Sequence, residues 1–426
     1  MGPGTVNSSA QPGAQAASAD AALEELRSRL LRYPIEQYPV QHAVSQFHLG
    51  VALLQSDRAP EALGALALAR SGFADAGLTL ELAKSENMQG VALREVGDLP
   101  GAGRAFAAAT ADFAKLDQPL EEAAASYNLG LVLRLLGGSA SAQVALARAG
   151  ELFTAANLPI QGGAAARELG TLLLTEGRLD EAVAVLTDAM DRARSGGDAA
   201  GTGAAANALG LAHLAAGARD EAVLAFRTAA STHPRSIRPA EHAMAKANLA
   251  LAYETQDPAR SRLAASQALA VSAAPPPVRE QAEAVLARLP AYMGGELFAV
   301  LEDVAEVGDE WAVVLRDEVT RWVDCSPAER SEAAGHWVGG ILQRSGRGPE
   351  FMEGFLNALL ELPPVAYERI IEAVVRASAR ESEEGADRFR SISRSAMARF
   401  PIPQWQRLAA TFDRVAAANG TPASWS

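Results

Sequence analysis

The sequence predicts an all-α protein in which six helix–turn–helix repeats form an α-solenoid, followed by a second all-helical domain. A small residue recurs along the chain with a period of 40 residues. Ala and Leu dominate the apolar residues and aromatic residues make up only 5%, a composition that suits closely packed helices better than sheets. No segment shows the period-2 alternation of a strand. The fold class follows from these three observations.

The repeat is anchored by one column of small residues. Leu precedes the column residue in five of the six repeats, and Gln89 is the exception. A turn residue follows seven positions later, as Asp or Gly. Each unit is therefore predicted to be a first helix, a tight turn and a second helix. The column consists of Gly50, Gly90, Gly130, Gly170, Gly210 and Ala250.

Further columns share the same period. Ala stands 12 positions after the Gly in the first five repeats, Leu or Phe stands 16 after it, and a second Ala stands 19 after it. Small residues let helix axes approach closely. Four repeats place Pro 11 positions before the column, where it fits the first turn of a helix. These prolines are Pro39, Pro119, Pro159 and Pro239.

This order of residues resembles the tetratricopeptide repeat family. The Leu-Gly pair, the turn Gly, the Ala and the later Leu/Phe-x-x-Ala match the family pattern in sequence. The period is longer than the usual ~34 residues and is similar to the extended repeats of kinesin light chains and of many bacterial arrays, so a bacterial source is expected. No repeat contains Trp, and the sixth has Arg262 at an Ala column. A degenerate last unit is typical where an array is capped.

The flanks differ in composition from the repeats. Asp20 is a candidate N-cap for a short capping helix. All five Trp and no Lys lie after residue 290, where the 40-residue period also ends. The predicted organisation is a disordered tail at 1–20, a capping helix and linker at 21–38, the six repeats at 39–278, a connecting helix at 279–290, and an all-helical domain at 291–426.

The bulk properties exclude several classes of protein. The net charge of −13 argues against general nucleic-acid or anionic-membrane binding. Cys325 is the only cysteine and can form no intrachain disulfide. The first 20 residues lack the charged start and apolar run of a signal peptide, and no apolar stretch is long enough to span a bilayer. A cytoplasmic protein is expected.

The sequence shows no catalytic motif, cofactor motif or metal site. It contains no phosphate loop, dinucleotide-binding turn or nucleophile elbow. The His residues lack metal-site spacing. Cys325 and His336 are predicted to lie near opposite ends of one helix, too far apart to act as a pair. An acidic run is interpreted as a solvated helix face, or otherwise as a docking patch for a basic partner; it comprises Glu296, Glu302, Asp303, Glu306, Asp309 and Glu310.

The resemblance implies that the first helix of each repeat lines a concave groove. Four positions per repeat fall on one helical face, at −6, −3, +1 and +4 from the column residue. This face is predicted to be cationic in repeats 2–4 and apolar in repeat 1, unless the Arg stems merely cover the helix surface. It lacks the carboxylate clamp of chaperone-binding members. The predicted binding residues are Lys84, Asn87, Arg94, Tyr127, Arg134, Arg167, Asn207 and Phe47.

Three functions are consistent with the sequence. The first is a non-catalytic scaffold or adaptor whose groove binds an acidic segment of a protein or peptide. The second is a regulatory protein that senses a peptide or small ligand through solenoid curvature. The third is an enzyme with a site in the C-terminal domain or between domains, although no residue pattern supports a reaction class. The sequence leaves the oligomeric state open.

Overall fold

The computed structural model describes residues 12–289, 297, 298, 301, 310–344, 346–422, 424 and 425. Within these ranges the regular structure is entirely helical and no strand occurs, which confirms the predicted fold class. No helix in the described part is long and apolar enough to cross a membrane. The chain divides into two compact units, residues 1–234 and 235–426.

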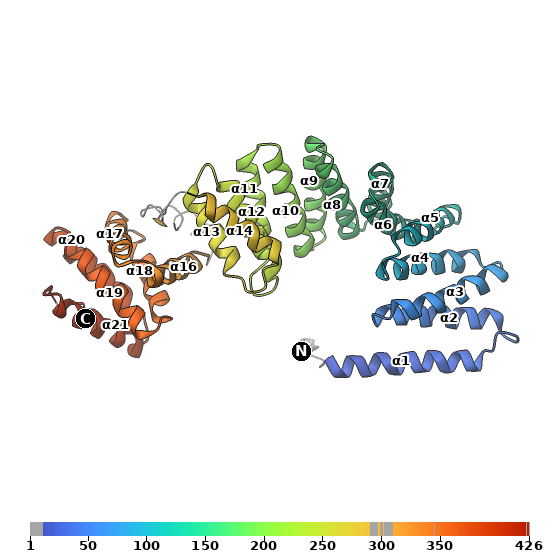
Figure 1. Cartoon of the computed structure of the whole chain (residues 1–426), viewed down its shortest axis with the longest axis horizontal. Coiled ribbons are helices and arrows are strands. Elements are labelled where there is room, and N and C mark those ends of the chain that lie inside the picture. The colour runs from blue at the N-terminus through green and yellow to red at the C-terminus, as the bar shows by residue number, and fades with distance from the viewer. Residues whose placement is uncertain are drawn as a thin grey trace, which may run out of the picture. The chain divides into compact units, whose positions relative to one another are not determined.

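Five consecutive helix pairs make up most of the first unit (Figure 1). We call the first helix of each pair A and the second B. Each B helix packs against its own A helix and against the A helix that follows. The pairs are α2 (Pro39–Gln55) with α3 (Ala59–Asp75), α4 (Thr79–Glu95) with α5 (Leu99–Lys115), α6 (Pro119–Leu135) with α7 (Ser139–Ala155), α8 (Pro159–Thr175) with α9 (Leu179–Ser195), and α10 (Ala199–Ala215) with α11 (Arg219–Thr232).

Residues with positive φ mark the turns of these repeats. The predicted turn column adopts it within each pair, with φ between 55° at Asp57 and 86° at Gly97. A second column, 20 residues further on, adopts it between pairs and was not predicted; it comprises Gly77, Asp117, Asn157 and Gly197. Gly, Asn and Asp tolerate this left-handed conformation best, so both ends of the B helices are fixed by residue type.

The Gly column and the later Leu/Phe column are the two sides of one contact. A Cβ atom on Gly170 would lie 2.5 Å from Cγ of Leu186, and one on Gly210 would lie 2.5 Å from Cε1 of Phe226. The same relation holds in the three preceding repeats. Only Gly leaves room for the large side chain of the B helix. The first Ala column is fully buried beside it, as at Ala142 and Ala182.

Helix α1 (Pro12–Arg32) packs on α2 and begins earlier than predicted. Asp20 lies inside this helix, so it is not the N-cap. Residues 13–19 are rich in Ala, the strongest helix former, which accounts for the earlier start. Leu23 is buried in one cluster with Leu49 and Leu53, as expected of a helix that caps the first repeat.

The A helices form the inner side of the first unit. Contacts between successive A helices are more extensive than any contacts between successive B helices in the described residues. A stack whose A helices are closer together than its B helices curves toward the A side. We call the surface made by the four predicted positions of each A helix the inner stripe. Of its 20 positions in repeats 1–5, only Leu54 and Asn207 are buried.

The sixth predicted repeat belongs to the second unit. It forms α12 (Pro239–Tyr253) and α13 (Pro258–Leu269), and α14 (Pro276–Arg288) packs against both. The break between units thus falls after the fifth helix pair. Ala250, which replaces the column Gly, is fully buried.

The remaining six described helices form two layers in the second unit. Helices of one layer contact each other in the order α16, α18, α20, and those of the other in the order α17, α19, α21. The core includes the buried residues Trp322, Trp337 and Trp425. The helices are α16 (Glu310–Asp324), α17 (Pro327–Gln343), α18 (Gly348–Leu360), α19 (Pro364–Ser378), α20 (Glu383–Met397) and α21 (Ile402–Ala418). The side chains of the predicted acidic run lie outside the described residues.

Candidate functional site

Two contacts between neighbouring A helices repeat with the same spacing. Arg94 Nη1 of α4 donates a hydrogen bond to Asn128 Oδ1 of α6 at 3.3 Å. One repeat later, Arg134 Nη2 of α6 lies 3.4 Å from Glu168 Oε2 of α8. In both cases, the residue four positions after one column Gly reaches the residue two positions before the next. The 40-residue period fixes this separation at 34.

Glu168 changes the predicted electrostatics of the inner stripe. The stripe positions of repeats 2–4 contain no acid, so an external anion was expected to neutralise all the Arg residues. The structure corrects this expectation, because Glu168 pairs with Arg167 at 2.8 Å as well as with Arg134. Its side chain is only 11% exposed. Glu168 is adjacent to the stripe rather than on it, and one carboxylate serves two guanidinium groups.

Tyr127 of α6 lies among these charges. Burial raises the pKa of its hydroxyl above the usual range, and the Glu168 carboxylate adds to the rise. The positive charges of Arg167, Arg94 and Arg134 act in the opposite direction. The hydroxyl therefore remains protonated at neutral pH and is available as a donor. The same electrostatic contacts place Tyr127 within reach of all three guanidinium groups.

We call this set of residues the arginine cluster. Three successive A helices contribute to it, and three Arg against one Glu leave a formal charge of +2. Among the described residues, Arg94 has no carboxylate partner, and the buried Nε of Arg134 has no hydrogen-bond partner. The cluster consists of Arg94, Tyr127, Asn128, Arg134, Arg167 and Glu168.

The other predicted binding residues lie outside the cluster. Lys84 precedes Arg94 by ten residues on α4, which is about 15 Å along the helix. Asn87 has a buried Oδ1 without a hydrogen-bond partner in the described chain. Phe47 makes an edge contact with Phe73 at a centroid distance of 6.4 Å. Asn207 is buried, at 9% exposed. The inner stripe is thus aromatic and apolar near α2 and cationic across α4, α6 and α8.

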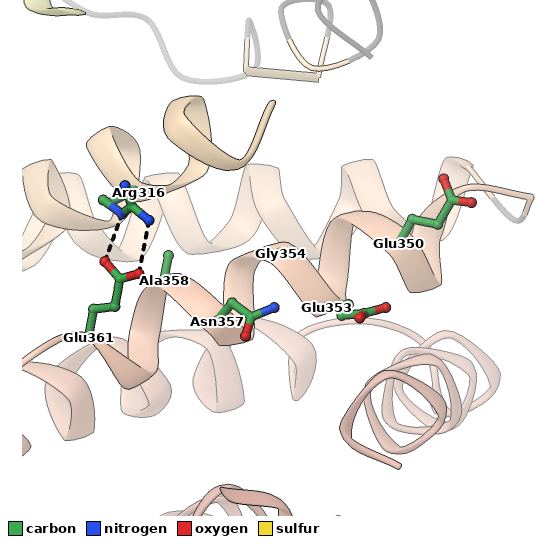
Figure 2. Close-up of a pocket in the computed structure, with 7 residues that line it drawn as sticks. All are labelled: Arg316, Glu350, Glu353, Gly354, Asn357, Ala358 and Glu361. Carbon is green, nitrogen blue, oxygen red and sulfur yellow. Dashed lines mark hydrogen bonds and ion pairs between the residues drawn. The ribbon is translucent and has the colours of Figure 1, made fainter. Parts of the chain in front are cut away.

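A pocket of about 370 Å³ lies between α16 and α18 in the second unit. Figure 2 shows Arg316 facing Glu361, with Glu353 and Asn357 further along α18. Arg316 Nε lies 2.7 Å from Glu361 Oε2. Glu353 pairs with Arg399 at 2.9 Å, and Glu350 lies 3.5 Å from Arg347. Each pocket carboxylate therefore has its own Arg, and this pocket holds little uncompensated charge.

The possible nucleophile pair does not form. Cys325 precedes α17, whereas His336 lies in the middle of that helix. Burial raises the pKa of the Cys325 thiol, and Arg330 and Arg321 only partly oppose the rise. A raised pKa lowers the thiolate fraction that a nucleophile needs. Across the described residues, no group of three or more His, Cys, Asp or Glu could hold a metal ion.

Comparison with known proteins gives likeness to solved structures alone. No protein-family model matches the chain, and no curated protein matches it. The apo form of RapI is 12% identical, with a TM-score of 0.48 over 87% of this chain and 95% of its own. A tetratricopeptide repeat protein from Parabacteroides merdae is 13% identical, with a TM-score of 0.43 over 64% of this chain and 94% of its own. BtubC from P. vanneervenii is 18% identical, with a TM-score of 0.43 over 51% of this chain and 89% of its own. Likenesses at this level indicate no ligand or activity for this chain.

Proposed function

We propose that this chain is a cytoplasmic, non-catalytic adaptor whose first unit binds an acidic peptide or protein segment along the inner stripe. The observation that carries the proposal is the formal charge of +2 at the arginine cluster, in a protein whose net charge is −13. A guanidinium group can donate two parallel hydrogen bonds to one carboxylate. An acidic side chain of the partner would supply the acceptors that the cluster lacks.

The length of the inner stripe suits an extended segment. The A helices from α2 to α8 contact one another in succession, and packed helix axes lie about 10 Å apart. Three such steps span about 30 Å, which is about nine residues of extended chain. Phe47 and the 36%-exposed Val44 offer apolar contacts at one end of this path. We expect the bound segment to have an apolar end and an acidic centre.

A regulatory role is the second candidate, because one observation favours it. The ion pair between Arg134 and Glu168 joins the A helices of two repeats. A ligand that competes with Glu168 for Arg134 would weaken this link and alter the relative placement of α6 and α8. Binding would then change the curvature of the first unit. An enzyme is less well supported, because the pocket carboxylates are all paired and Cys325 has a raised pKa.

Affinity capture tests the proposed site. The full chain, used as bait in extract of its native host, should retain a partner that the variant Arg94→Glu with Arg134→Glu loses. The matched control is Arg104→Glu with Arg227→Glu, which reverses two charges on B helices of the same unit. Circular dichroism should show unchanged helicity for both. Retention of the partner by the folded cluster variant would move the site elsewhere.

A further inference from the structure

The arginine cluster presents almost only hydrogen-bond donors to the inner stripe. Arg side chains donate and cannot accept. Asn128 Oδ1 already accepts from Arg94, which leaves its Nδ2 as the free, donating end of the amide. The protonated Tyr127 hydroxyl is a further donor. The one carboxylate, Glu168, is shared by two Arg residues. A ligand with many acceptor oxygens and no donor therefore matches the cluster.

The charge of the cluster also selects among anions. Glu168 compensates one of three positive charges, so two remain. A single carboxylate would neutralise only one of them. A phosphoryl group on a side chain carries about −1.5 to −2 at neutral pH and has three strong acceptor oxygens. Its charge matches that of the cluster, and its oxygens match the three helices from which the donors come.

We propose that the arginine cluster is a receptor for a doubly charged phosphoryl group on a peptide side chain, and that it selects this group over a single carboxylate. The proposal rests on the proposed function and specifies its ligand. Two neighbouring acidic side chains could also supply two negative charges. They do so with two separate carboxylates, whereas the donors of the cluster surround a single residue, Tyr127.

Short blocked peptides that differ only at the anionic residue test this selectivity. The probes are an alanine peptide with one phosphoserine, one with a single glutamate and one with two adjacent aspartates, titrated into the full chain by calorimetry at equal ionic strength. The phosphoserine peptide should bind at least about ten-fold more tightly than the glutamate peptide, because charge-assisted hydrogen bonds are the stronger class. Equal affinities would overturn the proposal, as would tighter or equal binding of the diaspartate peptide.

Two variants connect the selectivity with the cluster. Arg94→Gln lowers the cluster charge to +1 and should abolish most of the preference for phosphoserine. Arg104→Gln removes the same charge from an exposed site on α5 and should leave the preference unchanged. A preference that survives Arg94→Gln, or that Arg104→Gln removes equally, would contradict a site at the cluster.

The pH dependence gives an independent measurement. The second ionisation of a phosphorylated side chain has a pKa of about 6, so affinity for the phosphoserine peptide should rise several-fold between about pH 5 and pH 7. The glutamate peptide is ionised over this range and should show little change. Absence of the rise would overturn the doubly charged ligand. If both peptides need Arg94 and bind equally, the proposed function stands and this inference fails; if no peptide binds, the inference fails, and partner capture alone then decides the proposed function.

Discussion

Both units of this protein stack helices in layers, yet they compensate charge differently. In the second unit, ion pairs join successive helices of a layer one to one, as Arg316 with Glu361 and Arg414 with Glu368. In the first unit, Glu168 is shared by two Arg residues, and Arg94 has only an amide partner in the described chain. The pocket in the second unit is the more concave feature, but the inner stripe has the uncompensated charge. Charge balance, more than concavity, identifies the candidate site.

The largest expected effect on stability concerns the packing of the first unit. Ala142 and Ala182 are fully buried where A and B helices meet. Replacing either with Leu should overpack this contact and lower the free energy of unfolding by about 1–3 kcal/mol. The exposed positions Ala140 and Ala184 on the same helices provide controls, and Leu there should change stability little. Urea denaturation measures all four, and equal midpoints would show that the repeat register is wrong.

The second prediction removes the internal carboxylate of the cluster. Glu168→Gln raises the cluster charge to +3, so anionic probes should bind about ten-fold more tightly because a competing carboxylate is lost. Stability should fall by about 1–2 kcal/mol, between the values typical of exposed and buried pairs. The control Glu361→Gln breaks a pair that is about half exposed, and its cost should stay below about 1 kcal/mol. Calorimetry and denaturation would show whether the two carboxylates differ.

The third prediction concerns salt. The Arg134 and Arg167 side chains are about one third exposed, so their pairing with a ligand is open to screening. Raising the salt concentration from about 0.1 M to about 1 M shortens the Debye length from about 10 Å to about 3 Å. Affinity for the captured partner should fall about five-fold over this range. A partner bound by apolar contacts alone would keep or gain affinity.

The periodic part of the chain could be predicted closely, because one contact repeats in it. The Gly and Leu/Phe columns are visible in the sequence since each Gly must accommodate a large side chain 16 residues later. The role of Glu168 was missed because it breaks its column: the equivalent residues are His48, Met88, Asn128, Ala208 and Asn248. Its contact with Arg134 nevertheless follows from the period, which brings residues 34 apart together on successive A helices.

The second unit was predictable only in part. Its helix starts follow local signals, such as the capping box of Ser326 and Glu329 before α17. The predicted apolar faces are buried, including Phe355 and Ile371. The pocket was not predicted, because Arg316 and Glu361 are 45 residues apart without a repeating pattern to relate them. Contacts of this kind depend on how the layers pack.

The central claim is that the arginine cluster, and not the pocket of the second unit, binds the partner. Two matched double variants test it directly: Arg94→Gln with Arg134→Gln, and Arg316→Gln with Arg399→Gln. Each removes two positive charges and retains polar side chains. Two charge-assisted hydrogen bonds contribute about 3 kcal/mol or more, so the first variant should bind the captured partner at least about 100-fold more weakly in a titration of the purified proteins. The second should bind it within about two-fold of the unchanged chain. The reverse result, with binding lost only when the pocket is altered, would contradict the account.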